Sequence, residues 1–334
     1  MRIVIQIPCL NEEATIAAVI RDIRAAMKLY GDVIILVIDD GSTDGTVTAA
    51  TAAGADYIAC HRYNRGLAHA FMTGLAASLN LGADIIVNTD ADNQYKAECI
   101  PDLIRPIIEH RSDLVIGERP IDEIEHFSVL KKSLQHLGSW VVRVLSGTSV
   151  RDATSGFRAM SRDAAIRLNS FSCYTYTLET LIQAGWGNFR ITSVDIDINP
   201  PTRPSRLIRS IPQYIRRSTA DILRILTIYA PLRVFCIAGL IPLFCSVLLG
   251  LRYLFLVSFV DPTRSHAPSL ILVAILGFLG FLLFATGILG DLVSINRRLL
   301  ESLRVEQRRE MAAKGILIGP CDFDLVRTNQ EHTL

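Results

Sequence analysis

Two long runs without a charged side chain restrict most strongly what this 334-residue chain can fold into. Residues 234–251 form the first run, and residues 269–290 form the second. A helix of about 20 apolar residues spans the hydrocarbon core of a bilayer, and backbone groups in lipid must bond within their own segment. The sequence therefore predicts an integral membrane protein with two transmembrane helices, at residues 232–257 and 269–291. A helical hairpin buried inside a soluble protein is the alternative.

Arginines are distributed unevenly around these two runs. Many lie before the first run or after the second, whereas Arg264 lies between them and Arg252 lies near the end of the first. Because Lys and Arg are retained on the cytoplasmic side of a membrane, the N-terminal part of the chain and both termini are predicted to be cytosolic. The cysteines form no CxxC pair, which agrees with reduced thiols in the cytosol. The flanking arginines are Arg203, Arg206, Arg209, Arg216, Arg217, Arg224, Arg233, Arg297, Arg298, Arg304, Arg308 and Arg309.

Residues 208–230 combine arginine with isoleucine, leucine and tyrosine at an approximately helical period. This pattern predicts an amphipathic helix lying on anionic headgroups, and an ordinary basic helix in solvent is the alternative. The predicted organisation is a cytosolic domain at residues 1–207, the interfacial helix at 208–230, the membrane hairpin at 231–292 and a cytosolic tail without a motif at 293–334.

The N-terminal part of the chain alternates between strand and helix patterns. Short β-branched runs at residues 3–8, 33–38 and 85–89 predict buried strands, with a further strand near residue 57. Helical patterns lie between them, at residues 13–29, 45–53 and 66–79. This alternation predicts an α/β fold with a doubly wound, mostly parallel, Rossmann-like sheet.

Polar side chains follow three of the predicted strands, where ligands bind in such sheets. They are Asn11 and Glu12 after the first strand, the run from Asp39 to Asp44 after the second, and Asp90 and Asp92 after a later one. Asp90 and Asp92 are alternate residues that project the same way, and two carboxylates suit Mg²⁺ or Mn²⁺ on a diphosphate. Taken alone, the run from Asp39 to Asp44 is better explained as a turn with a helix N-cap, and an Asp-x-Asp pair also occurs by chance.

Taken together, these motifs resemble the family 2 glycosyltransferases, which have the GT-A fold. With a two-span tail, the chain is most similar to the polyprenyl-phosphate glycosyl synthases, a group that includes dolichyl-phosphate mannose synthase. The matching positions are Pro8, Asn11 and Glu12; Asp39 to Asp44; Asn64, Arg65, Gly66, Ala70 and Gly74; Asp90 and Asp92; and Ser155 to Arg158.

The resemblance implies which residues bind the nucleotide-sugar and its metal. Asp90, Asp92 and Gln94 match the family's metal-binding motif, and Asp90 would also lie against the donor. The family often has an aromatic residue where this chain has Leu10, which leaves uracil and guanine open as the base. The donor residues implied are Pro8, Leu10, Glu12, Asp39, Asp40, Asp90 and Arg206.

The resemblance also implies a cationic site for a lipid phosphate, formed by Arg119, Lys131 and Lys132. A metal ion neutralises the charge that develops on the departing diphosphate, and an ionised phosphate acceptor needs cationic neighbours more than a general base. Asp90, Asp92 and Arg119 are therefore the predicted catalytic residues. A solvated helix face is the alternative for the lysines, and headgroup anchoring is the alternative for Arg206. Arg158 is expected to order the site without taking part in the chemistry.

The predicted activity is inverting transfer of a sugar, mannose or glucose, from a GDP- or UDP-sugar to dolichyl or undecaprenyl phosphate at the cytosolic face. A net charge of +1 gives no reason to expect nucleic acid as a partner, and a homo-oligomer remains open. The alternatives are transfer to another membrane glycan or polysaccharide and a non-catalytic membrane scaffold. A processive polysaccharide synthase usually carries a Gln-x-x-Arg-Trp motif, which this chain lacks.

Overall fold

The computed structural model describes residues 1–120, 129–169, 176–200, 219–220, 223–224, 226–260, 267–314 and 324–328, with the side chains of 129–136, 260, 313 and 324 excluded. The chain divides into two compact units. The first unit contains Met1–Ser218 and Arg304–Leu334, and the second contains Thr219–Leu303. Most of the predicted interfacial helix at residues 208–230 lies outside the described residues.

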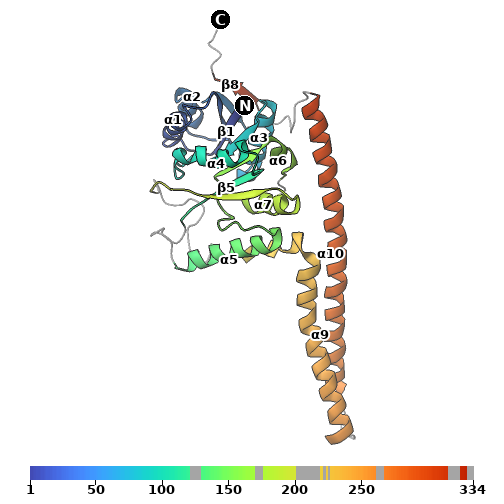
Figure 1. Ribbon diagram of the computed structural model, residues 1–334. Helices are drawn as coiled ribbons and strands as arrows, with labels where there is room; N and C mark the ends of the chain where they lie inside the picture. Colours follow the sequence, from blue (N-terminus) through green and yellow to red (C-terminus); the bar gives the residue numbers. More distant parts are fainter. Residues whose placement is uncertain are drawn as a thin grey trace. The chain divides into compact units, whose positions relative to one another are not determined.

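An eight-stranded sheet forms the centre of the first unit, with the strand order β7-β5-β6-β4-β1-β2-β3-β8 (Figure 1). The pairs β1–β2, β1–β4, β2–β3 and β5–β7 are parallel, whereas β6 and β8 run antiparallel to their neighbours. The predicted doubly wound, mostly parallel, GT-A-like sheet is therefore confirmed. The strands are β1 (Arg2–Cys9), β2 (Asp32–Asp39), β3 (Tyr57–Cys60), β4 (Ile85–Asn88), β5 (Leu114–Glu118), β6 (Arg158–Ser161), β7 (Ile191–Asp195) and β8 (Asp324–Arg327).

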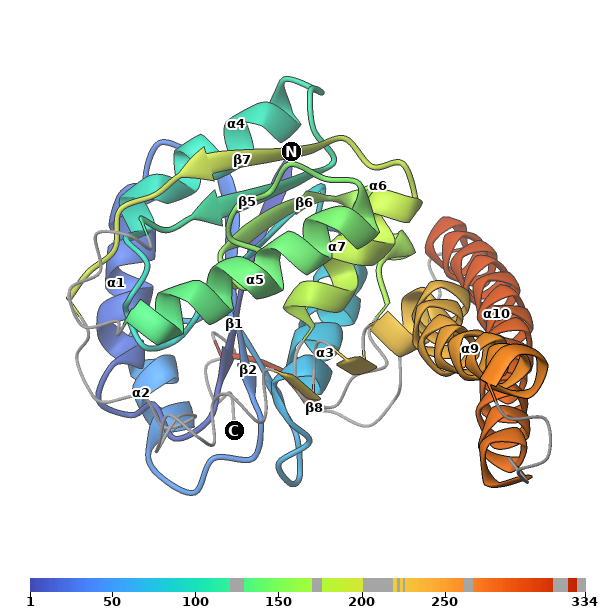
Figure 2. The same ribbon diagram turned by 90° about the horizontal axis from the view of Figure 1, so that it is seen from below.

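Helices cover both faces of this sheet (Figure 2). On one face, α1 (Ile16–Ala26), α2 (Thr46–Ala52) and α4 (Ile100–Ile108) pack on alternate β1 residues such as Ile3 and Ile5. The α1 contact follows from its sequence, because its buried residues Ile16, Val19, Ile20 and Ile23 recur at helical spacing. The other helices of this unit are α3 (Leu67–Asn80), α5 (Val129–Ser146), α6 (Arg162–Arg167) and α7 (Thr177–Trp186).

Helix α3 lies unusually close to the opposite face of the sheet. A Cβ atom on Gly74 would come within 2.5 Å of Gln6 Oε1 and 3.0 Å of Ile38. Glycine at this position therefore permits the close approach of the helix to β1 and β2. Three helices that sequence patterns predicted, α1, α2 and α3, form within two or three residues of their expected ends.

Two long apolar helices dominate the second unit. Helix α9 (Pro231–Phe255) continues as the π-helical segment η3 (Leu256–Val260), and α10 comprises Ala267–Ala313. Both are long and apolar enough to cross a membrane, with mean hydropathies of 2.5 and 2.6 in their most apolar parts. The two helices lie side by side at Gly239 and Gly280, because a Cβ atom on either glycine would lie 3.0 Å from the carbonyl oxygen of the other. A hydrogen bond also joins them, from Ser246 Oγ to the Val273 carbonyl at 2.8 Å. Small residues at such a contact are typical of packed membrane helices.

The C-terminal segment contributes to the first unit, which the sequence did not predict. Strand β8 pairs antiparallel with β3, and the Thr328 amide donates to the Asp56 carbonyl at 3.1 Å. Near the end of α10, Arg308 Nη1 donates to the Leu168 carbonyl at 2.9 Å, and Arg309 pairs with Asp163 at 2.7 Å. A four-residue strand without clear alternation carries too little sequence signal to be recognised in advance.

Candidate active site

The predicted donor residues that the structure describes gather at one edge of the sheet. Parallel pairing sets Cys9 beside Asp39 and Asp39 beside Cys60, so β1, β2 and β3 end together. Gln6 pairs with Asn88, so the segment after β4 reaches the same edge with Asp90 and Asp92. Because the carboxyl ends of parallel strands meet at one edge, this is where a ligand is expected in the fold.

The loops after β1 and β2 are bonded into one surface. The Asn11 amide donates to Ser42 Oγ at 2.9 Å, and the Thr43 amide donates to Asn11 Oδ1 at 2.8 Å. The Glu12 amide donates to Thr46 Oγ1 at 2.8 Å. Asn11 has a φ of +55°, a left-handed conformation that asparagine tolerates better than most residues. Buried Pro8 and half-buried Leu10 and Glu12 are carried on this surface.

Asp39 and Asp40 are both buried, but they have different surroundings. Asp39 accepts a hydrogen bond from the Ser42 amide at 3.2 Å. Asp40 accepts from the amides of Arg65 and Gly66, at 2.9 and 2.8 Å, and its Oδ1 lies 2.7 Å from a ring nitrogen of His61. Asp40 therefore holds the loop that begins α3, and the direct contact with the donor that the resemblance implies stays a prediction.

The electrostatics of Asp40 agree with this structural task. Burial alone would raise the pKa of its carboxyl, but hydrogen bonds from His61 and the two loop amides hold that pKa below its usual value. The other ring nitrogen of His61 lies 2.9 Å from Thr73 Oγ1 on α3. Asp40, His61 and Thr73 therefore form a chain of hydrogen bonds that joins β2, the loop after β3 and α3.

Asp90 and Asp92 form the acidic end of the β4 segment. Burial and then the negative charge of Asp92 raise the pKa of Asp90 to about 7. Asp92 Oδ1 accepts a hydrogen bond from the Gln94 amide at 3.1 Å, which fixes the turn between them. No group of three or more His, Cys, Asp or Glu side chains that could enclose a metal ion occurs within the described residues.

A buried polar network lies directly beneath Asp90, and the sequence analysis did not identify it. Asn88 Nδ2 donates to the Gly156 carbonyl at 2.8 Å and to the Tyr176 hydroxyl at 2.9 Å, while Asn88 Oδ1 accepts from Gln6 at 2.8 Å. The Gly156 amide donates to the Tyr95 hydroxyl at 3.1 Å. The network ties β1, β4, α7 and the segment before β6 together.

Gly156 lets this segment lie against the acidic pair. A Cβ atom there would stand 3.1 Å from Asp90 Oδ1 and 3.1 Å from the Tyr176 hydroxyl, closer than ordinary contacts allow. Tyr176 is held in turn by stacking on Phe71 of α3, with ring centroids 3.8 Å apart. The only sequence signal for this arrangement was the Ser-Gly-Phe-Arg motif itself.

Arg158 in that motif is completely buried. Its guanidinium donates to the carbonyl oxygens of Ala153, Ser155 and Thr177 at 2.8–2.9 Å. It therefore fixes the loop before β6 and the start of α7, as expected of a residue that orders the site.

Arg119, at the end of β5, forms a bidentate ion pair with Asp152. Arg119 Nε and Nη2 donate to the two carboxylate oxygens at 2.6 and 3.0 Å, and Nη2 also donates to Thr154 Oγ1 at 2.9 Å. Burial alone would raise the pKa of Asp152, but the Arg119 charge holds that pKa below its usual value. This pair closes the base of the segment that contains α5.

Three predicted cationic residues are not placed by the structure. Arg206 lies outside the described residues, and Lys131 and Lys132 lie on α5 where only the backbone is described. Their roles therefore remain predictions.

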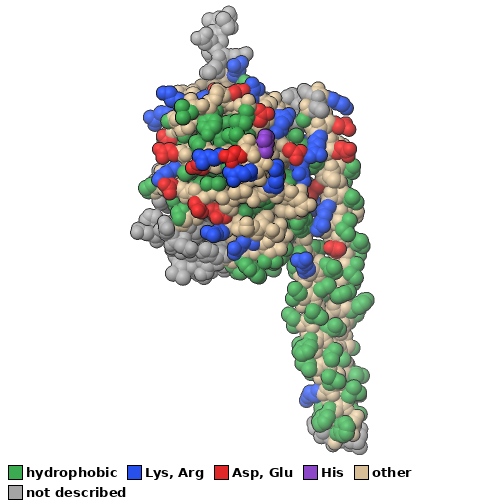
Figure 3. Space-filling model, viewed as in Figure 1, with side chains coloured by type: hydrophobic (Ala, Val, Ile, Leu, Met, Phe, Trp, Pro, Cys, Tyr) green, Lys and Arg blue, Asp and Glu red, His purple; other side chains and the backbone are tan. Residues whose placement is uncertain are grey.

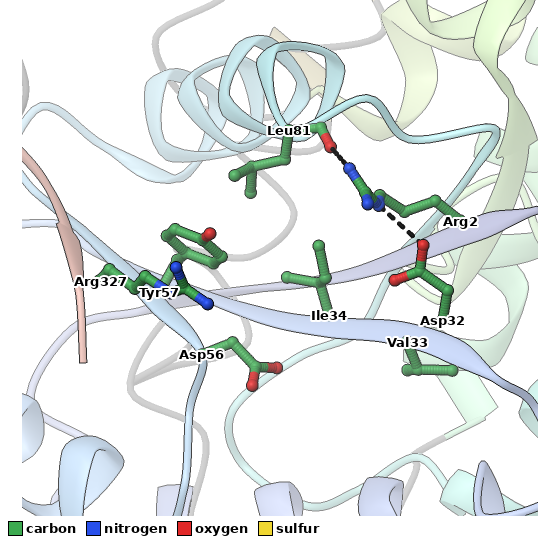
Figure 4. A pocket seen from close by; sticks show the side chains of 8 residues that line it. All are labelled: Arg2, Asp32, Val33, Ile34, Asp56, Tyr57, Leu81 and Arg327. Carbon is green, nitrogen blue, oxygen red and sulfur yellow. Dashed lines mark hydrogen bonds and ion pairs between the residues drawn. The ribbon is translucent and has the colours of Figure 1, made fainter. Parts of the chain in front are cut away.

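A pocket lies at the other edge of the sheet, where β1 and β2 begin (Figure 4). Arg2 crosses it, donating to the Leu81 carbonyl at 2.7 Å and to Asp32 at 2.9 Å. The remaining lining residues include Asp56, Tyr57 and Arg327, and none of the predicted site residues is among them. The predicted donor site therefore belongs to the opposite, carboxyl edge.

Comparisons with known proteins agree with this architecture. The model of glycosyl transferase family 2 matches residues 4–168. The undecaprenyl-phosphate mannosyltransferase of Micrococcus luteus is 32% identical over 184 residues, which cover 53% of this chain and 74% of that protein. The UDP-N-acetylglucosamine–dolichyl-phosphate N-acetylglucosaminyltransferase of Methanococcus voltae is 34% identical over 176 residues, covering 47% and 68%.

Among solved structures, glucosyl-3-phosphoglycerate synthase from Mycobacterium tuberculosis is similar in fold. It has a TM-score of 0.55 and 24% identity, covers 68% of this chain and 77% of its own, and was crystallised with Mn²⁺, UDP and phosphoglyceric acid. The mixed sheet and this similarity thus define a GT-A-like fold. With the family match and these relatives, the chain belongs to glycosyl transferase family 2, which confirms the resemblance seen in its sequence.

Proposed function

We propose that this enzyme transfers a hexose from a nucleotide-sugar to a polyprenyl phosphate at a membrane surface. The observation that carries the proposal is the Asp90–Asp92 strand end of a family 2 fold in a chain with two helices able to span a bilayer. The names of the two relatives described above support it, because each specifies transfer to a polyprenyl or dolichyl phosphate.

The donor would bind along the carboxyl edge of β1, β2 and β4. Pro8, Leu10 and Glu12 would face the nucleoside, and Asp39 would accept a hydrogen bond from the base or ribose. Asp90 would lie at the sugar-diphosphate, with Arg206 as a further phosphate contact. Asp40 would hold the loop at residues 64–66 in place and would also bind the donor.

The acidic pair has the chemistry of a divalent-ion site that is completed by substrate. Asp90 and Asp92 offer carboxylate oxygens, Gln94 offers an amide oxygen, and Mg²⁺ or Mn²⁺ commonly takes its remaining ligands from phosphates and water. Burial and then the negative charge of Asp92 raise the pKa of Asp90, and a bound cation would offset both effects. When bound, such an ion would supply neutralisation of the charge left on the departing diphosphate.

The acceptor would be held by cationic side chains. A phosphate oxygen of the lipid would bond to the anomeric carbon as the bond from that carbon to the β-phosphate oxygen breaks, and the nucleoside diphosphate would leave with the electron pair. This single displacement inverts the anomeric configuration. Because the acceptor oxygen is already ionised at neutral pH, Arg119, Lys131 and Lys132 would serve to bind and orient it.

The membrane orientation follows from the arginine distribution. The catalytic domain and both termini would be cytosolic, with the turn between α9 and α10 on the far side. Mannose or glucose is the proposed sugar, carried by GDP or UDP.

A transfer assay in detergent tests the function. The purified enzyme receives a panel of labelled GDP- and UDP-sugars, including UDP-N-acetylglucosamine, with Mn²⁺ or Mg²⁺ and a polyprenyl phosphate. Label that enters the organic phase with one donor, and only with metal, would support the proposal and identify the sugar. Donor turnover without a lipid product would refute the proposed acceptor.

A further inference from the structure

The outward face of α5 is apolar. Leu137, Trp140 and Val144 are 49%, 54% and 55% exposed. They are spaced by three and four residues, so they lie on one face of the helix. Half-exposed leucine, tryptophan and valine on one face of a helix in water leave apolar surface uncovered.

The opposite face of α5 is already packed, so the exposed face cannot be its core face. Val142 and Ser146 are buried, and the Ala153 amide donates to Ser139 Oγ at 3.3 Å. Trp186 Nε1 on α7 donates to the Leu145 carbonyl at 2.9 Å. A Cβ on Gly185 would overlap the Ser146 carbonyl oxygen, so α5 and α7 are in close contact.

This concentration of apolar surface is particular to α5 within the described part of the first unit. The other exposed large apolar side chains there are distributed over other elements, as Met1, Leu29, Tyr63, Leu67, Leu325 and Val326. In Figure 3, hydrophobic side chains gather along the lower border of the domain, in the region where Figure 1 draws α5. Scattered exposed apolar residues are ordinary, whereas a contiguous face indicates a contact.

We propose that this face of α5 inserts into the interfacial layer of the lipid bilayer, as a second membrane contact separate from the α9–α10 hairpin. A bilayer is the natural occupant for this face, because the same chain has two long helices that are apolar enough to cross one. Tryptophan is enriched at the membrane–water boundary, and apolar helix faces bind there with the helix in the membrane plane. A lipid surface therefore fits both the composition of the face and its place in a membrane-anchored chain.

The contact has a consequence for the active site. Helix α5 belongs to the segment between Arg119 and Asp152, whose bidentate ion pair closes the segment at its base. Insertion of α5 would fix the distance between Arg119 and the lipid headgroups. This part rests on the proposed function, in which Arg119 binds the lipid phosphate.

Tryptophan fluorescence tests the membrane contact without relying on activity. The full chain contains two tryptophans, Trp140 and half-buried Trp186. The wild type and Trp140→Phe are reconstituted in nanodiscs of ordinary lipids or of lipids brominated near the headgroup or near the acyl-chain end. We expect quenching of the wild type, strongest with bromine near the headgroup, and its loss in Trp140→Phe.

Equal fluorescence of the wild type in brominated and ordinary lipids would overturn the proposal. In that case a second copy or another segment of this chain would cover the α5 face. The Trp186→Phe variant tests whether the quenched fluorescence comes from Trp140. Trp140 is then the sole tryptophan, so the quenching must persist.

An activity measurement tests the consequence for the acceptor. Trp140→Glu should raise the KM for a long-chain polyprenyl phosphate in bilayers on the order of tenfold, the factor that losing one buried large apolar side chain produces. The KM for the nucleotide-sugar should not change. The matched control is Leu29→Glu, which places the same charge at a 96% exposed position on another element. Equal effects of the two variants would refute the link between α5 and the acceptor, while the quenching result would still decide the membrane contact.

Discussion

The two halves of the candidate active site are built in different ways. The donor half, at the ends of β1 and β2, is held by short loops whose side chains bond to neighbouring backbone amides, as Asn11 and Ser42 do. The other half is held by bonds between two largely buried side chains, such as Asn88 with Tyr176 and Arg119 with Asp152. The proposed donor half lies on polar motifs that directly follow strands and can be recognised in a sequence, whereas the half proposed to face the acceptor depends on side-chain packing between elements.

The largest expected effect tests the acidic strand end that both halves share. Asp92→Ala should lower the transfer rate by about a thousandfold or more, because electrostatic stabilisation of a leaving group is commonly worth several kcal/mol. Thermal unfolding should change little, since Asp92 lies at a half-exposed strand end. Asp102→Ala, which removes an exposed carboxylate on α4 paired with Arg105, is the control. Equal activity of Asp92→Ala and the control would contradict the role of the strand end.

The second prediction concerns the buried ion pair of the acceptor half. Asp152→Asn should lower the free energy of unfolding by about 3–5 kcal/mol, because it leaves the Arg119 charge without its partner. Replacing Asp113, whose pair with Arg190 is exposed, should have a far smaller effect on the same denaturation curve. A loss for Asp152→Asn no greater than for the Asp113 variant would show that the buried pair does not stabilise this half.

The same pair should give a pH dependence of known sign. The folded-state pKa of Asp152 is depressed, so its ionised carboxylate stabilises the protein above the unfolded-state pKa of about 3.9. This contribution is lost as the pH falls from there through the lower folded-state pKa. The difference in unfolding free energy between the wild type and Asp152→Asn should therefore be constant near neutral pH and shrink in acid. A difference that grew toward low pH would contradict this assignment.

A smaller effect is expected where the two halves meet. Gly156→Ala adds a methyl group 3.1 Å from Asp90 Oδ1, so one of the two must shift. The metal concentration for half-maximal activity should rise by about tenfold, as is usual when a group beside a metal ligand is disturbed. Gly31→Ala is the control, because a Cβ there has no neighbour within 4 Å. If Gly156→Ala leaves the metal requirement unchanged, the Ser-Gly-Phe-Arg loop does not affect metal binding at Asp90 and Asp92.

The smallest effect should come from the sheet edge next to the donor half. Thr328→Val removes the hydroxyl that donates to the Ala55 carbonyl and lies 3.0 Å from the Asp56 carbonyl. The loss in unfolding free energy should be about 1 kcal/mol, the typical net value of one hydrogen bond. Transfer activity should be unchanged, because Thr328 lies beside the first residues of β3, whereas the candidate site lies at the other end of that strand. A large loss of activity would mean that β8 supports the donor site directly.

The sequence predicted features that depend on neighbouring residues. The apolar runs at β1, β2 and β4 predicted the sheet, and the polar residues after them predicted the carboxyl edge where Asp39 and Asp90 are found together. The two uncharged runs predicted apolar helices, and these runs lie within α9 and α10.

Other features depend on contacts that the sequence does not encode locally. Asn88 is a single polar residue in an apolar strand, and nothing beside it indicates the bond to Gly156, 68 residues away. Asp40 belongs to a motif, yet only the fold reveals that its oxygens bond to the loop at Arg65 and Gly66. The apolar face of α5 has the same origin, since helical spacing alone does not tell which face the rest of the domain covers.

The position of β8 at the edge of the sheet imposes an order on biosynthesis. Residues 324–327 are translated after both apolar helices, although their partner β3 is among the first segments to be made. The edge of β3 therefore stays open while the hairpin is synthesised, and an open strand edge is a place where chains associate wrongly. The sheet of the first unit is thus completed only after both apolar helices have been translated.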